Sequence, residues 1–158
     1  SASLVGSEMC IRDSSEMEIK LFLGLIQFSE DISWKEAELK RMLLFTRKYD
    51  SKKIKEQAEM SILKELASIQ EEKGDAQKEL EYIEQALTLV KESRTMRGLA
   101  ELHFKKAGLL KELMQRNKDM QQEYQKQCQV ELTMAYYTAL VMNNVELVQK
   151  IKTTGDRV

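Results

Sequence analysis

The sequence predicts an all-α fold, on three observations. The 158 residues include no proline and only six glycines, so few residues interrupt regular structure. Leu, Glu, Lys, Gln, Met and Ala dominate, and these residues lose the least free energy on entering a helix. From Ser15 onward the apolar residues recur at helical spacing. The length is that of one domain, and we expect about seven helices.

The charge balance and the cysteine count exclude several functional classes. There are 25 basic and 26 acidic residues, which gives a net charge of −1 and argues against direct contact with nucleic acid. The two cysteines, Cys10 and Cys128, are too few for a disulfide framework, and reduced thiols indicate a cytoplasmic protein. No apolar run approaches the roughly 20 residues that span a bilayer, so we expect no membrane contact.

The first two helices are predicted over residues 15–29 and 33–49. The first is apolar nearly all round, so we expect it to be buried on more than one side. Ser33 and Glu36 have the spacing of a capping box, which predicts the start of the second helix. Its inward residues are predicted to be Trp34, Ala37, Met42, Leu43 and Phe45.

The third and fourth helices are predicted around a Gly-Asp turn. Asp50 or Ser51 should cap the third helix, which runs to about residue 73. Gly74 should end it, because glycine adopts the left-handed conformation at little cost. Asp75 should then cap the fourth helix, over residues 76–92.

Three further helices complete the prediction, over residues 95–116, 119–142 and 145–152. Asn143 and Asn144 should separate the last two, and residues 153–158 should form a frayed tail. All the predicted connections are two to five residues long, and short connections favour antiparallel neighbouring helices.

A repeated pattern suggests how these helices pair. The segment Leu66-Ala67…Gly74-Asp75-Ala76…Ile83…Ala86-Leu87 resembles a tetratricopeptide repeat, a helical hairpin of about 34 residues. Small residues that would let paired helices approach recur at Gly24, Ala67 and Gly108, and Glu79 stands where that repeat usually has a small residue. The resemblance implies antiparallel hairpins stacked as a right-handed solenoid over residues 15–152.

The long, degenerate repeats are similar to the sensor half of bacterial peptide-responsive regulators of the Rgg/PlcR type. The ending Ala135-Tyr136-Tyr137…Met142-Asn143-Asn144…Glu146-Leu147 also carries this resemblance. It implies a domain that binds a short peptide on its concave face and forms a homodimer. It also implies a DNA-binding helix-turn-helix domain that lies outside this sequence. The alternative is a scaffold or adaptor that binds protein segments through the same kind of repeat.

The repeat register predicts a peptide groove on the first helix of each hairpin. Polar groups there would bind the peptide backbone and apolar groups its side chains. The alternative is that these residues are the ordinary surface of a scaffold. The predicted groove residues are Leu21, Leu25, Phe28, Lys64, Ser68, Glu71, Lys105, Leu109 and Glu112.

No catalytic, metal-binding or cofactor-binding motif is found, so we do not expect an enzyme. His103 is the single histidine and is interpreted as a core or groove-edge residue, with a pH-sensitive switch as the alternative. Cys128 is interpreted as a buried structural cysteine, and most of the nine methionines as core residues. A third hypothesis, an enzyme, requires His103 and Cys128 to line one cleft.

The first residues differ from the rest in having no periodic pattern. Residues 4–14, LVGSEMCIRDS, resemble the translation of a transposase adapter used for sequencing libraries. We therefore expect residues 1–14 to be a disordered, non-native leader, as would arise in a fragment from metagenomic DNA. We also expect the first helix to have lost an upstream partner and to expose an apolar patch.

Overall fold

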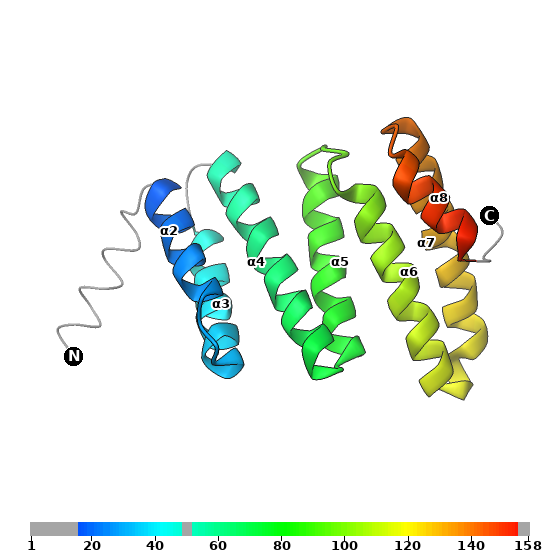
Figure 1. Ribbon diagram of the computed structural model, residues 1–158, viewed down its shortest axis with the longest axis horizontal. Coiled ribbons are helices and arrows are strands. Elements are labelled where there is room, and N and C mark those ends of the chain that lie inside the picture. Colours follow the sequence, from blue (N-terminus) through cyan, green and yellow to red (C-terminus); the bar gives the residue numbers. More distant parts are fainter. Residues whose placement is uncertain (1–15, 49–51, 155–158) are drawn as a thin grey trace. The chain divides into compact units, whose positions relative to one another are not determined.

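The computed structural model describes residues 16–48 and 52–154, and within these ranges the protein is all-α (Figure 1). This confirms the predicted fold class and the predicted number of helices. The predicted leader, the predicted caps Asp50 and Ser51, and most of the predicted tail lie outside the described residues. The described ranges contain seven α-helices and one 3₁₀ turn: α2 (Glu16–Gln27), α3 (Ile32–Thr46), α4 (Lys52–Lys73), α5 (Ala76–Glu92), α6 (Leu99–Arg116), η1 (Lys118–Met120), α7 (Gln121–Val141) and α8 (Val145–Thr153).

The chain forms two compact units, and the division falls within α4. The first unit ends at Ile69 and the second begins at Gln70. No helix in the described residues is both long and apolar enough to cross a membrane.

In the first unit, polar contacts join α2 and α3 to α4. Gln27 Nε2 on α2 donates to Glu65 Oε1 on α4 at 3.0 Å, and Lys35 Nζ on α3 lies 3.5 Å from Glu65 Oε2. Arg47 Nε, at the end of α3, donates to Glu59 Oε1 at 2.8 Å. The apolar residues buried in this unit are Ile19, Ile26, Leu39, Met42, Leu43, Ala58, Ile62, Leu63, Leu66, Ala67 and Ile69.

The start of α3 differs from the prediction. Asp31, not Ser33, is the N-cap, and its Oδ1 accepts hydrogen bonds from the amides of Ser33 and Trp34 at 3.0 Å. The predicted capping box is therefore wrong: Asp31 already satisfies the free amides, and Glu36 pairs with Lys40 instead.

Two residues of α3 that were predicted to face inward are exposed. Trp34 is 45% exposed, and Ala37 is exposed as well, whereas Met42 and Leu43 are buried and Phe45 is half-buried. The apolar pattern of the helix was therefore a poor guide to its buried side at the N-terminal end.

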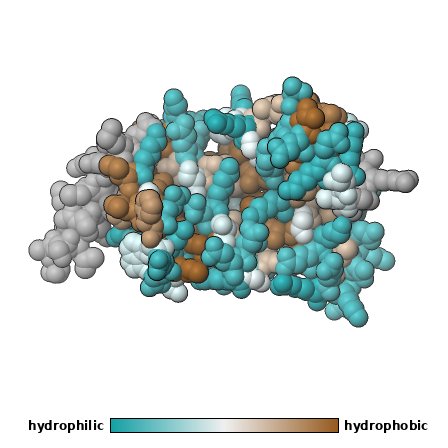
Figure 2. Space-filling view, viewed as in Figure 1, coloured by the Kyte–Doolittle hydropathy of each residue, from teal (hydrophilic) through white to brown (hydrophobic). Residues whose placement is uncertain are grey.

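Helix α2 buries one side and exposes the other. Ile19 and Ile26 are buried, whereas Leu21, Leu25 and Phe28 are 62%, 69% and 88% exposed. Figure 2 shows the apolar surface over α2. The expected exposed patch is present, and the expectation that the helix is buried on more than one side is wrong for these three residues.

The turn between α4 and α5 confirms its sequence prediction. Gly74 has a φ of 69°, the left-handed conformation that ends α4. The Asp75 side chain accepts from the amide of Lys78 at 3.1 Å and so caps α5. Asn143, with a φ of 54°, ends α7, and Asn144 caps α8 by accepting from Leu147 N at 3.1 Å.

Helix α6 starts four residues later than predicted. Arg94 and Gly98 both have positive φ values, 52° and 77°, and this backbone cannot continue into a helix. The segment between α5 and α6 is therefore a loop that the helical residue composition did not reveal.

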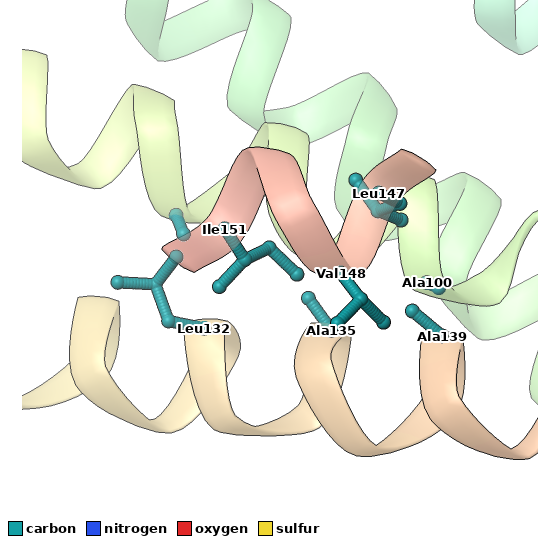
Figure 3. Close-up of a cluster of buried hydrophobic side chains, with 8 residues drawn as sticks. Ala100, Leu132, Ala135, Ala139, Leu147, Val148 and Ile151 are labelled. Atoms are coloured by element: carbon teal, nitrogen blue, oxygen red, sulfur yellow. The ribbon is translucent and has the colours of Figure 1, made fainter. Parts of the chain in front are cut away.

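One hydrophobic cluster of the second unit lies where α8 packs against α6 and α7 (Figure 3). Alanines on α6 and α7 leave room for larger side chains from α8, and Ile151 is fully buried among them. The cluster consists of Ala100, Ala107, Leu132, Ala135, Ala139, Leu147, Val148 and Ile151. This packing fixes α8 beside α6 and so forms one wall of the site described next.

Candidate functional site

A pocket of about 570 Å³ lies in the second unit, with α6 as its floor. Its volume falls in the range of small-molecule and peptide sites. The end of α4 and the start of α5 contribute Glu71 and Glu79, and α8 contributes Lys150. The full lining is Glu71, Gly74, Ala76, Glu79, Glu101, Phe104, Lys105, Ala107, Gly108, Leu109, Lys111, Glu112, Cys128, Leu132, Leu147, Lys150 and Thr154.

The floor is built from one stripe of α6. Residues 101, 104, 105, 108, 111 and 112 recur at intervals of three and four, which places them on one side of a helix. Phe104 and Leu109 supply apolar surface, and Leu132 and Leu147 continue it from α7 and α8. The stripe covers about 16 Å along the helix axis, and an extended peptide of about five residues has this length.

Gly108 lies at the centre of this stripe and keeps the floor open. A Cβ built on Gly108 has no atom of the protein within 4 Å, and the same holds at Gly24 in the first unit. The prediction that glycine at these two positions allows helices to approach is therefore wrong. At Gly108 the missing side chain instead leaves backbone accessible in the pocket.

The wall formed by α4 and α5 carries an ion-pair cluster centred on Lys105. The Lys105 Nζ atom lies 3.0 Å from Glu71 Oε2 and 3.1 Å from Glu79 Oε1. Glu79 is only 3% exposed, and its burial raises the pKa of the carboxyl although Lys105 opposes this. Burial alone would lower the pKa of Lys105, but hydrogen bonds to Glu71 and Glu79 outweigh it and raise that pKa.

The ion pair with Lys105 explains why Glu79 stands at a position where the repeat pattern has a small residue. A buried carboxylate is costly unless it is paired and hydrogen-bonded, and Lys105 provides both from the neighbouring helix. The acidic residue at a position that usually holds a small one is therefore part of the pocket wall.

Near the end of the pocket at the α4–α5 turn, Arg116 joins α6 to that turn without lining the pocket. Its Nη2 atom pairs with Glu112 Oε1 at 2.5 Å, and its Nη1 atom donates to the carbonyl oxygen of Gly74 at 3.3 Å. The acidic residues of this end are thus each paired with a basic group from α6.

The α8 wall differs from the α4–α5 wall in its charged groups, because it contributes a lysine, Lys150, in place of an ion-pair cluster. Lys150 Nζ lies 5.4 Å from the centroid of the Phe104 ring, a cation–π distance, and is exposed. Within the described residues no carboxylate pairs with Lys150. Nearby, Glu101 Oε1 accepts from Asn144 Nδ2 at 2.8 Å, which ties α6 to the start of α8.

Four of the nine predicted groove residues line this pocket: Glu71, Lys105, Leu109 and Glu112. The other five lie in the first unit. Leu21 and Leu25 are exposed on α2, Phe28 is exposed just after its end, and Lys64 and Ser68 are exposed on α4. Phe104 and Lys111 were missed although their helical spacing from Gly108 was readable. Lys150 could not be found from the sequence, because its place beside α6 depends on the packing of α8.

His103 and Cys128 do not share a cleft. Cys128 is half-buried, lines the pocket, and donates from Sγ to the carbonyl oxygen of Ala107 at 3.4 Å. His103 is 3% exposed, is absent from the pocket lining, and its Nδ1 atom lies 2.5 Å from Glu131 Oε2 on α7. The juxtaposition that the enzyme hypothesis requires is therefore not formed.

Glu131 also belongs to an ion-pair cluster, which lies outside the pocket lining and joins α5, α6 and α7. Lys106 Nζ lies 3.0 Å from both Glu131 Oε1 and Glu84 Oε1. Burial alone would raise the pKa of Glu131, but hydrogen bonds from His103 and Lys106 outweigh it and lower that pKa. Within the described residues no group of three potential ligands could hold a metal ion.

Comparison with protein-family models, with curated proteins and with solved structures gives no match for this chain.

Proposed function

We propose that the pocket on α6 binds a short peptide segment. The observation that carries this proposal is an open apolar floor, centred on Gly108, between two walls of charged side chains. Apolar floors bind peptide side chains, and polar walls satisfy the peptide backbone and its charges. A length of about five extended residues matches the floor.

The proposed biological role is peptide sensing in a transcriptional regulator of the Rgg/PlcR type. The helical hairpin with its Gly-Asp turn and the pocket on the first helix of the next hairpin support this role. The alternative role is an adaptor that binds a segment of another protein. A helix-turn-helix segment encoded in frame upstream of residue 15 would favour the regulator, and a kinase, protease or further repeat there would favour the adaptor.

Thermal unfolding in the presence of pools of random pentapeptides tests the binding itself. A peptide at 100 times its dissociation constant should stabilise the protein by about 2.7 kcal/mol. Gly108→Phe should abolish the shift by filling the floor. Gly24→Phe is the matched control, because it adds the same side chain at a helical glycine of the first unit that also has open space. If no pool shifts the unfolding temperature, the proposal is contradicted.

A specific observation also supports homodimer formation through α7. Val130, Met134, Tyr137 and Val141 follow each other at intervals of four, three and four residues, and each is at least 45% exposed. Residues 132–145 include no charged residue, so two copies of this surface would not place like charges together. We call the set of exposed apolar residues here the α7 surface; it consists of Val130, Met134, Tyr137, Leu140, Val141, Met142 and Val145.

The exposure of the α7 surface favours a second copy of this chain as its partner. Each of its seven residues is at least 45% exposed, and apolar residues of this kind form the centre of a standard interface of ~800 Å² per partner. Sedimentation equilibrium should therefore show a dimer, and Val141→Lys should convert it to a monomer. Leu25→Lys, which changes an exposed leucine of α2, should leave the dimer intact. A monomeric wild-type protein at 100 μM would contradict this part of the proposal.

A further inference from the structure

We infer that the peptide bound in the α6 pocket carries a carboxylate that pairs with Lys150 at the α8 wall. This inference rests on the proposed peptide-binding function and adds a ligand class and an orientation to it. It follows from the interactions that the charged groups of the pocket lining make within the protein; Lys111, the third lysine of the lining, also has such an interaction.

The acidic groups of the pocket already have partners within the protein. Lys105 neutralises Glu71 and Glu79, Arg116 pairs with Glu112, and Asn144 donates to Glu101. A cationic group on the ligand would compete with Lys105 or Arg116 at three of these carboxylates, and only Glu101 is held by a neutral group. Removing Lys105 from Glu79 would leave a carboxylate that is 3% exposed without its cation.

Lys150 differs from these acidic residues, because its ammonium group pairs with no carboxylate of the described residues. The only interaction of its side chain within the described part of the chain is with the face of the Phe104 ring, which leaves the N–H donors of its ammonium group available. Phe104 and Leu147 beside it present apolar surface, so an ion pair formed here is partly shielded from water. A carboxylate of the ligand gains a charge-assisted hydrogen bond there and displaces no internal contact.

The placement of Lys150 sets the direction of the peptide. Asn144 contacts Glu101 and Lys150 covers Phe104, so α8 runs beside the N-terminal half of α6. Lys105, one residue after Phe104, connects Glu71 and Glu79 to α6, and Arg116 connects the α4–α5 turn to the C-terminal end of α6. The carboxylate of the peptide therefore lies over the N-terminal half of α6, and its apolar side chains extend over Gly108 toward Leu109.

The chain provides a closely matched control for Lys150. Lys152 lies two residues away on the same helix, and its Nζ atom lies 6.0 Å from the centroid of the Tyr136 ring. Lys152 thus has the same charge and the same kind of aromatic contact, but it does not line the pocket.

The experiment uses the full chain with Cys10→Ser, so that Cys128 in the pocket is the single thiol. Pools of apolar pentapeptides are prepared in two forms, with a free C-terminal carboxylate and with a C-terminal amide. The rate at which a thiol reagent modifies Cys128 is measured against peptide concentration. Binding over the floor should slow the reaction, and the midpoint gives an apparent affinity.

We expect the carboxylate form to bind about three- to tenfold more tightly than the amide form, as for a partly shielded ion pair. Lys150→Met should remove this preference, and Lys152→Met should retain it. Equal protection by both forms would overturn the inference and leave peptide binding intact. Protection by neither form would overturn the proposed function itself. A preference that survives Lys150→Met would place the carboxylate elsewhere and also overturn the inference.

Discussion

Two neighbouring lysines of α6 face different surroundings, and each joins two glutamates. Lys105 contacts Glu71 and Glu79 in the pocket wall, whereas Lys106 contacts Glu84 and Glu131 between α5, α6 and α7. Their side chains are 38% and 17% exposed. The same kind of ion-pair cluster thus forms part of the pocket wall at Lys105 and joins three helices outside the pocket at Lys106. Ion pairs alone do not identify the site; the cavity beside them does.

The largest expected effect contrasts two adjacent leucines. Leu110 is 1% exposed and lies away from the pocket lining, whereas Leu109 is 5% exposed and borders the pocket. Leu110→Ala leaves a closed cavity and should lower the free energy of unfolding by about 3–5 kcal/mol. Leu109→Ala only enlarges an existing pocket and should cost about 2–3 kcal/mol. Urea denaturation of both variants measures the difference, and equal losses would indicate that the pocket is closed in solution.

The next contrast removes the two lysines. Lys105→Met leaves the buried Glu79 without its cation and should cost about 1–3 kcal/mol at pH 7. Lys106→Met should cost less, about 1 kcal/mol, because Glu131 still contacts His103. Denaturation of the two variants side by side checks the order, and a greater loss for Lys106→Met would contradict it.

The pH dependence of these variants gives a second check on the same contrast. The pKa of Glu79 is raised above its ordinary value of 4.5, so the folded state binds this proton more readily than the unfolded state. The loss in Lys105→Met should therefore shrink as the pH falls from 7 toward 4.5. A loss that stays constant over this range would mean that Glu79 is not the destabilised group.

Glu131 should show the opposite pH behaviour. Its pKa is lowered below 4.5, so the stability that it contributes is present above pH 4.5 and is lost as the pH falls through its folded-state pKa. Glu131→Gln should remove that part of the acid sensitivity. Unfolding followed by circular dichroism between pH 7 and pH 2 measures it, and identical acid transitions in both proteins would contradict the assignment.

The smallest expected effect concerns the two open glycines. Gly108→Ala and Gly24→Ala should each raise the free energy of unfolding by about 0.5–1 kcal/mol, because alanine favours the helix and meets no neighbouring atom. Only Gly108→Ala should also weaken peptide binding, since its methyl group extends over the pocket floor. Calorimetric unfolding and peptide titration of both variants separate the two effects, and destabilisation by Gly108→Ala would contradict the open floor.

Much of the fold could be predicted from the sequence because its signals are local. Helical spacing gave the all-α class, and Gly74, Asp75, Asn143 and Asn144 marked the helix ends correctly. The predicted helix starts were wrong at α3 and α6, where a nearby side chain or an unusual backbone conformation sets the first residue of the helix. Asp31 outcompetes Ser33 as a cap, and the positive φ of Arg94 is invisible in a residue with ordinary helix propensity.

The site was harder to predict because it depends on contacts between helices. The repeat register singled out Lys105, Leu109 and Glu112, and these residues line the α6 side of the pocket. It gave no signal for Lys150 or Cys128, which reach the pocket from α8 and α7. The repeat pattern marked Glu79 only as a departure from the usual small residue, whereas the structure shows that it forms an ion pair with Lys105 in the pocket wall.

Methyl NMR of leucine-labelled protein tests the central claim most directly, because Leu109 and Leu110 report on the two sides of α6. The titration uses the pentapeptide pool with a free C-terminal carboxylate. We predict that the Leu109 methyl resonances shift progressively and saturably, whereas those of Leu110 change little. Resonances of Leu109 that do not move while the unfolding temperature rises would show that peptide binds elsewhere, and would contradict the account.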